Sequence, residues 1–242
     1  MMPSFEALLV VGIVGFYLYD SAMLLYSNEL VYVKTLGRWS FVKPATHWQL
    51  MGRFPHVPNP LTPNQFMLRV IWNRESSPVP ENLMAELQEF TQVLKPLHYL
   101  TVLLLATLLF SLPIVLLRWG TGTIFMALVL LSYLNVVIML MFVYRKRDAL
   151  RITGKTFRGL AFESLACVPF AINLVRKISL QYPFRGGAIE FAQQAFSAQI
   201  FGRLIQALLS RIDEELAIED EDSRRARDLC TYRACLSSLQ PE

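Results

Sequence analysis

Three runs of apolar residues, each about as long as a lipid bilayer is thick, constrain this chain more than any other feature. They cover residues 7–25, 97–117 and 124–144, and the second and third contain no Asp, Glu, Lys or Arg. About 20 apolar residues in helical form cross a hydrocarbon core of roughly 30 Å. The runs therefore predict three transmembrane helices.

The overall composition supports this interpretation. Hydrophobic residues make up 54% of the chain and charged residues 17%, against roughly 45–50% and 25% in soluble domains. A chain of 242 residues cannot bury so much apolar surface in one core. We expect the first run to be a retained anchor and not a secretory signal, because residues 1–6 carry no basic side chain and no small-residue cleavage site closes the run.

The distribution of basic residues predicts the orientation. Segments rich in Lys and Arg beside membrane helices stay in the cytoplasm. Six such residues follow the third run, with Asp148 as the only acidic residue among them: Arg145, Lys146, Arg147, Arg151, Lys155 and Arg158. We therefore expect a protein of a bacterial cytoplasmic (inner) membrane, with its amino terminus outside, its carboxyl terminus inside, and these six side chains at the anionic lipid headgroups.

The predicted fold class is an α-helical integral membrane protein with three transmembrane helices, a small cytoplasmic β-sheet insertion and a cytoplasmic helical carboxyl-terminal domain. The expected divisions are residues 1–27, the first membrane helix; 28–95, the sheet with an amphipathic connector helix; 96–144, a membrane hairpin; 145–182, a basic segment with an interfacial helix; and 183–242, the helical domain.

The sheet region contains four β-prone stretches, 29–34, 38–43, 47–54 and 66–72, and Gly37 suits a hairpin turn between the first two. The proline-rich segment 55–63 is not expected inside a strand. Leu83, Leu87, Phe90 and Leu94 then recur at helical spacing and predict the connector helix, which continues through Pro96 into the second membrane run.

Residues 159–180 are apolar enough to raise the question of a fourth span. Glu163, Pro169 and Asn173, followed by Arg176 and Lys177, argue against it, because charge and a central proline are costly in lipid. We expect instead a helix in the membrane interface, with Arg176 and Lys177 near anionic headgroups.

The strongest amphipathic pattern outside the membrane runs lies near the carboxyl terminus. Its apolar side chains recur at i, i+3, i+4 and i+7, and predict a packing face or a partner face: Phe201, Leu204, Ile205, Leu208, Ile212 and Leu216. An acidic run, 213–222, and a basic run, 224–227, follow. They are typical of either a helical hairpin or a solvated linker.

Two polar residues stand out within the membrane runs, where polar side chains are expensive to bury. Asn135 lies midway along the third run, and we expect its amide to hydrogen-bond between helices. Asp20 lies late in the first run, and its position is compatible with either an interfacial or a functional residue.

No motif for catalysis, phosphate binding or metal binding is present in the sequence. His47, His56 and His98 have no metal-ligand spacing, and neither do Cys167, Cys230 and Cys235. We expect no enzyme, cofactor or nucleic-acid partner. The leading hypothesis is a membrane accessory or scaffold protein that presents cytoplasmic domains to partner proteins or to a second copy of itself. One alternative is a subunit of an oligomeric channel or transporter, in which several copies of Asn135 or Asp20 would surround a path. A second alternative is a membrane enzyme of unrecognised type.

Overall fold

The computed structural model describes residues 5–26, 28–35, 37–42, 53–71, 79–184, 186–218 and 223–239. The chain is mostly helical and forms two compact units. Unit 1 comprises Met1–Leu24, Pro55–Leu68 and Asn82–Pro183, and unit 2 comprises Leu25–Phe54, Arg69–Glu81 and Phe184–Glu242. The expected sheet region 28–95 is therefore divided between the two units, because chain segments that are distant in sequence pack together.

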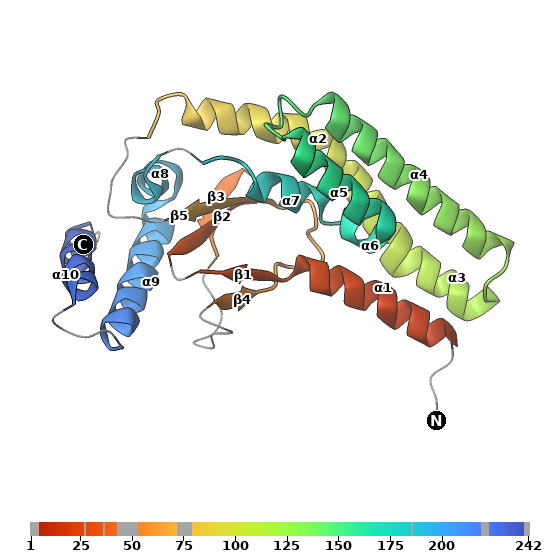
Figure 1. Cartoon of the computed structure of the whole chain (residues 1–242), viewed down its shortest axis with the longest axis horizontal. Coiled ribbons are helices and arrows are strands. Elements are labelled where there is room, and N and C mark those ends of the chain that lie inside the picture. Colours follow the sequence, from red (N-terminus) through yellow and green to blue (C-terminus); the bar gives the residue numbers. More distant parts are fainter. Residues whose placement is uncertain are drawn as a thin grey trace. The chain divides into compact units, whose positions relative to one another are not determined.

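Unit 1 contains seven of the α-helices in the described residues and one π-helical turn (Figure 1). They are α1 (Phe5–Ser21), α2 (Leu83–Ala106), η1 (Thr107–Ser111), α3 (Leu112–Trp119), α4 (Thr123–Arg145), α5 (Gly154–Ala166), α6 (Val168–Ala171) and α7 (Leu174–Leu180).

The α2, η1 and α3 segments form one long helix, Leu83–Trp119, with Pro96 inside it. The predicted connector helix is thus continuous with the second apolar run. Its first half buries Leu83, Leu87 and Phe90, at the spacing of one helix face. The π-helical turn lies within the apolar half, where Thr107 donates its hydroxyl to the carbonyl of Leu103.

Two helices of unit 1 are long and apolar enough to cross a membrane: Leu83–Trp119 and Thr123–Arg145. They correspond to the second and third predicted runs, and α4 packs against α2 and α3. At 17 residues, α1 is shorter than either of them and carries Glu6 and Asp20.

Residues 159–180 do not form the single helix that the sequence predicted. They belong to α5, α6 and α7, which are separated by Cys167 in an extended conformation and by a turn at Asn173. Pro169 lacks a backbone N–H, so it is tolerated at the start of α6 but would break the interior of a longer helix.

The described strands form two small sheets. The larger has the order β3-β2-β5, from β2 (Glu29–Thr35), β3 (Arg38–Phe41) and β5 (Phe66–Ile71), and the smaller pairs β1 (Met23–Leu25) with β4 (Phe54–His56). Strands β2 and β3 are antiparallel, and Gly37 between them has a φ of +80°, which a glycine adopts without strain.

Three of the four predicted strands are confirmed, as β2, β3 and β5. The remaining prediction, 47–54, lies largely outside the described residues. Strand β4 begins at its last residue and includes Pro55, which the sequence analysis had excluded from strands. In a two-stranded ribbon every strand is an edge strand, so a proline whose nitrogen faces away from the ladder leaves no hydrogen bond unmade.

Unit 2 contains α8 (Ala188–Ala195), α9 (Ala198–Leu216) and α10 (Arg224–Ser237). The side chains of Ser197 and Ser223 cap α9 and α10 by accepting backbone N–H groups. In the core, Tyr32 stacks on Phe191 with ring centroids 5.8 Å apart and donates its hydroxyl to the carbonyl of Ala188 at 2.9 Å. This bond satisfies a buried phenol and joins β2 to the start of α8.

Candidate functional site

A cluster of polar side chains lies within unit 1 at the carboxyl-terminal end of α1. The Asp20 carboxylate pairs with Lys177 Nζ at 2.6 Å and accepts a hydrogen bond from Asn173 Nδ2 at 3.0 Å. Lys177 also pairs with Glu163 at 2.9 Å. The Asp20 side chain is 9% exposed and that of Glu163 is 50% exposed. Asp20 therefore lies at the buried end of the cluster and Glu163 at its solvent-accessible end.

Hydrogen bonds extend this cluster along the last turn of α1. Asn173 Nδ2 also lies 2.9 Å from Ser21 Oγ, and Ser21 Oγ donates to the carbonyl of Tyr17 at 2.8 Å. The Tyr17 hydroxyl donates to the carbonyl of Pro60 at 2.5 Å. The end of α1 is thus bonded both to the α6–α7 turn and to the proline-rich segment.

The structure corrects the expected position of Arg176. This side chain is 3% exposed, whereas the sequence analysis expected it near anionic headgroups. It donates to the carbonyl of Thr62 at 2.6 Å, to the carbonyl of Asn59, and to Asn173 Oδ1 at 3.3 Å. Burial lowers the pKa of its guanidinium, but the carbonyl oxygens of the proline-rich segment solvate the charge in place of water.

Lys177 also differs from its expected role. Its ammonium group pairs with two carboxylates and lies 5.1 Å from the centre of the Phe170 ring. The positive charge of Lys177 is therefore compensated within unit 1. The cluster holds two carboxylates, Asp20 and Glu163, and two cations, Arg176 and Lys177. Its formal charges cancel, and it joins four segments of unit 1.

The sequence analysis singled out Asp20 but missed its connections. Tyr17 and Ser21 are four residues apart and therefore lie on one face of α1, which is a local signal for a polar stripe. The carbonyl groups of Asn59 and Thr62 leave no signal in a sequence, because every residue has one.

Asn135 lies between two helices, as the sequence analysis expected of an interhelical amide. Its Nδ2 donates to the carbonyl of Leu100 on α2 at 3.1 Å, and the side chain is buried. Its Oδ1 is also buried but accepts no hydrogen bond from the described residues. The amide thus satisfies one of its two polar ends within the chain.

The basic residues after α4 lie at the surface. Arg151 differs from the others, because it pairs with Glu86 at 2.6 Å and lies over the ring of Tyr182. It has a φ of +53°, and its pKa is raised by the Glu86 carboxylate. Arg147 pairs with the exposed Asp148 and lies over the ring of Tyr144. The rest have no ion pair among the described residues: Arg145, Lys146, Lys155 and Arg158.

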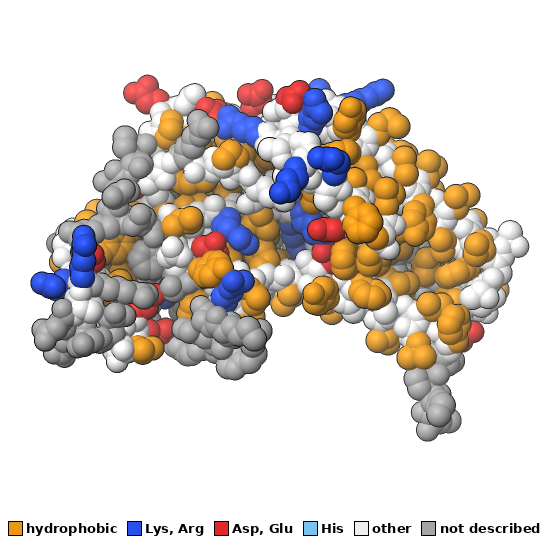
Figure 2. Space-filling view, in the orientation of Figure 1, with side chains coloured by type: hydrophobic (Ala, Val, Ile, Leu, Met, Phe, Trp, Pro, Cys, Tyr) orange, Lys and Arg blue, Asp and Glu red, His pale blue; other side chains and the backbone are white. Residues whose placement is uncertain are grey.

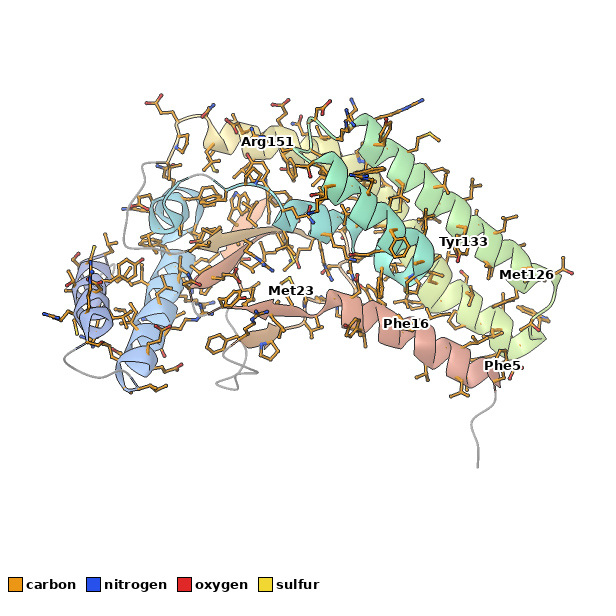
Figure 3. The ribbon with its side chains drawn as sticks, in the orientation of Figure 1. Phe5, Phe16, Met23, Met126, Tyr133 and Arg151 are labelled. Atoms are coloured by element: carbon orange, nitrogen blue, oxygen red, sulfur yellow. The ribbon has the colours of Figure 1, made fainter. Side chains whose placement is uncertain are left out.

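A cavity of about 330 Å³ lies between α1, α4 and the α5–α6 junction, with η1 and α3 on a further side. Its lining is mostly apolar, and includes Phe16 of α1 and Tyr133 of α4, which Figure 3 labels. Gly12 also lines it and has no neighbouring atom within 4 Å of an added Cβ. The lining offers no acid, base or cation for chemistry.

The predicted apolar face of α9 is internal to unit 2. Phe201, Leu204, Ile205, Leu208 and Ile212 are buried, and Leu216 is half-buried. Helix α9 packs against α8, α10 and β3. It is therefore a packing face in this chain, and a partner would have to use other surfaces of the unit.

The histidines and cysteines that the structure describes do not assemble into a site. His56 lies on β4, where burial and the charge of Arg176 lower its pKa, and His98 lies on α2. His47 lies outside the described residues. Cys167 is half-buried, and Cys230 and Cys235 are exposed on α10. In the part of the chain that the structure describes, no three His, Cys, Asp or Glu side chains come together to hold a metal ion.

No protein-family model matches the chain, and none of the curated proteins or solved structures with which it was compared is similar to it.

Proposed function

We propose that unit 1 is a three-helix membrane anchor and that unit 2 is a cytoplasmic domain presented to partner proteins. The observation that carries this proposal is the exposure of large apolar side chains along the helices of unit 1. Figure 2 shows these side chains gathered over α1, α3 and α4. A soluble protein rarely exposes so extended an apolar surface, whereas lipid tails would cover it.

Helix α4 shows this exposure of apolar side chains most clearly. Only 28% of its most apolar 18-residue window is buried inside the chain, although a core helix of a soluble protein would be mostly buried. Its exposed side chains form one broad face of the helix, which includes Met126, Leu130, Leu134, Ile138 and Met141. Water would solvate them poorly, and lipid would solvate them well.

The third span of the proposal is α1. Its 17 residues extend for about 25 Å, close to the lower limit for crossing a hydrocarbon core. Phe5, Leu8, Val11 and Phe16 are exposed along it. Asp20, the charged residue near its end, pairs with Lys177 and so does not face lipid as an isolated charge.

The orientation follows from the charge at the two ends of the α3–α4 hairpin. One end carries Arg118 alone, and the other carries the basic residues that begin at Arg145. The positive-inside rule places the second end, and with it the chain that follows, in the cytoplasm. Unit 2 then lies inside the cell, and the unpaired basic side chains lie where anionic headgroups attract them.

The channel alternative gains no support from Asn135. Its amide is bonded to Leu100 of the same chain, so it is not presented to a path between subunits. Partner binding by unit 2 is the better supported role, since the described part of this unit contains no candidate span and has charged outer helix faces.

Two measurements on native membranes test the proposal. Alkaline carbonate extraction should leave the full chain in the membrane pellet. A membrane-impermeant maleimide should label exposed Cys230 and Cys235 only after the cells are permeabilised. In a Cys230→Ser/Cys235→Ser background, the substitution Thr121→Cys, in the α3–α4 turn, should allow labelling from outside. Extraction into the supernatant, or labelling of unit 2 in intact cells, would contradict the proposal.

A further inference from the structure

A groove in unit 2 separates strand β3 from the outer face of α9. Its volume is about 450 Å³, and the groove is open to the surface. Two of its lining residues come from the strand and five from the helix: Ser40, Phe41, Ile200, Arg203, Gln206, Ala207 and Ser210. Protein domains can bind an extended peptide by adding it as a strand to an exposed sheet edge, where neighbouring pockets receive alternate side chains.

Strand β3 is an edge strand, because among the described strands it has a neighbour only in β2. The pairing register determines which of its backbone groups face outward. Val42 donates its N–H to the carbonyl of Val31, and Ser40 is paired with Val33. In an antiparallel ladder, alternate residues bond to the neighbour, so the N–H and carbonyl of Phe41 point away from β2. Phe41 also lines the groove.

On β5, the other outer strand in the order β3-β2-β5, a backbone N–H is bonded to a side chain. On β5, the N–H of Met67 donates to Ser179 Oγ of α7 at 3.1 Å. Natural sheets commonly cover or block their edges, because exposed strand edges pair with other chains. An edge that keeps an outward backbone donor and acceptor beside a groove is therefore a place where a strand can add.

The polar side chains on the α9 side of the groove can distinguish one peptide side chain from another. Arg203, Gln206 and Ser210 line the groove and are exposed along α9, and Arg203 has no ion pair among the described residues. A guanidinium group favours a carboxylate, which it can bind with two parallel hydrogen bonds. Ile200 and Ala207 provide apolar surface between these polar groups.

We propose that this groove binds an extended peptide segment of a partner protein, which adds as a strand beside β3 and places an acidic side chain against Arg203. The proposal rests on the proposed function, because it names the kind of partner that unit 2 takes. Main-chain bonds to Phe41 provide affinity, and Arg203 with its neighbours on α9 provides selectivity for acidic segments.

The test uses the full chain in detergent micelles and a display library of random ten-residue peptides. Recovered peptides should share an acidic residue flanked by alternating apolar residues. Fluorescence anisotropy with a recovered peptide should show binding weakened about tenfold or more by Arg203→Glu, which turns attraction into repulsion. Ala207→Trp, which fills the groove, should abolish binding. Arg227→Glu is the matched control, because this arginine on α10 is exposed and has no ion pair with the residues that the structure describes; it should leave binding unchanged.

Strand addition has its own signature. A peptide N-methylated at alternate positions keeps its side chains but loses main-chain donors, so one of the two methylated registers should fail to bind. Hydrogen exchange at the N–H of Phe41 should slow when the unmodified peptide binds. An empty library selection, or peptides insensitive to both groove variants, would overturn the proposal. Because the assay needs no membrane, these outcomes are independent of the labelling experiment that tests the location of unit 2.

Discussion

The two single substitutions that break the Asp20–Lys177 pair, Lys177→Met and Asp20→Asn, should reduce the free energy of unfolding by unequal amounts. Lys177→Met leaves the Asp20 carboxylate, only 9% exposed, with the amide of Asn173 as its remaining polar contact among the described residues. Removing one partner of a buried ion pair costs about 3–5 kcal/mol of stability, because the other charge stays buried without compensation. We expect a cost in this range for Lys177→Met.

Asp20→Asn should cost less. The ammonium group of Lys177 keeps its contact with Glu163 at 2.9 Å, and this carboxylate is half exposed. The loss then resembles that of one charge-assisted hydrogen bond, about 1.5–3 kcal/mol. In the double variant no uncompensated carboxylate remains, so its cost should fall below the sum of the single costs by about 1–3 kcal/mol.

Reversible unfolding in mixed detergent micelles, followed by circular dichroism, measures all three variants. The Arg233–Asp213 pair is the matched control, because its atoms are 2.7 Å apart but its side chains are 51% and 53% exposed. Exposed pairs contribute about 0–1 kcal/mol, so Arg233→Met should have little effect. Equal costs for the two single variants of the buried pair, or strict additivity in the double variant, would refute the reasoning.

Three further outcomes are expected. Asn135→Leu should be nearly neutral or stabilising in the same assay, because it removes a buried oxygen that accepts no hydrogen bond from the described residues. Asn135→Asp should reduce membrane insertion by about 2.5–3.5 kcal/mol in a glycosylation-based insertion assay. Leu208→Ala should cost about 2–5 kcal/mol, because Leu208 is fully buried, and Arg203→Ala on the exposed face of the same helix should stay within about 0.5 kcal/mol in thermal melts. Burial raises the pKa of the Tyr232 hydroxyl from 10.0 to about 12, so its contribution to stability is complete below pH 10 and is lost between about pH 10 and 12. In thermal melts from pH 9 to 11, Tyr232→Phe should lose less stability with rising pH than the unchanged chain. Equal losses of stability would contradict this assignment.

The sequence by itself determined the elements whose signal is periodic and local. The apolar runs at 97–117 and 124–144 correspond to the two helices that are long enough to cross a membrane. The stripe through Leu204 and Leu208 predicted the buried face of α9, because residues three and four apart share one side of a helix. Strands β2, β3 and β5 were also found where β-prone residues cluster.

The elements between 159 and 180 required the tertiary structure. Their apolar composition and paired basic residues indicated one helix at the headgroups, yet the chain forms three short helices. Pro169 gave a local reason for a break, but the direction that the chain takes after it depends on what it packs against. In the structure, α6 packs against α1 and α4, and α7 packs against α2.

Only the tertiary structure decided the roles of the charged residues. Arg176 and Lys177 carry the same local signal as any pair of basic residues beside an apolar segment. Their partners are a carboxylate on α1 and carbonyl groups of the proline-rich segment, more than one hundred positions earlier in the chain. A charge is attracted to a headgroup, a carboxylate or a carbonyl by the same electrostatics. The fold determines which of these lies within hydrogen-bonding distance, and that choice depends on contacts between segments that no local pattern records.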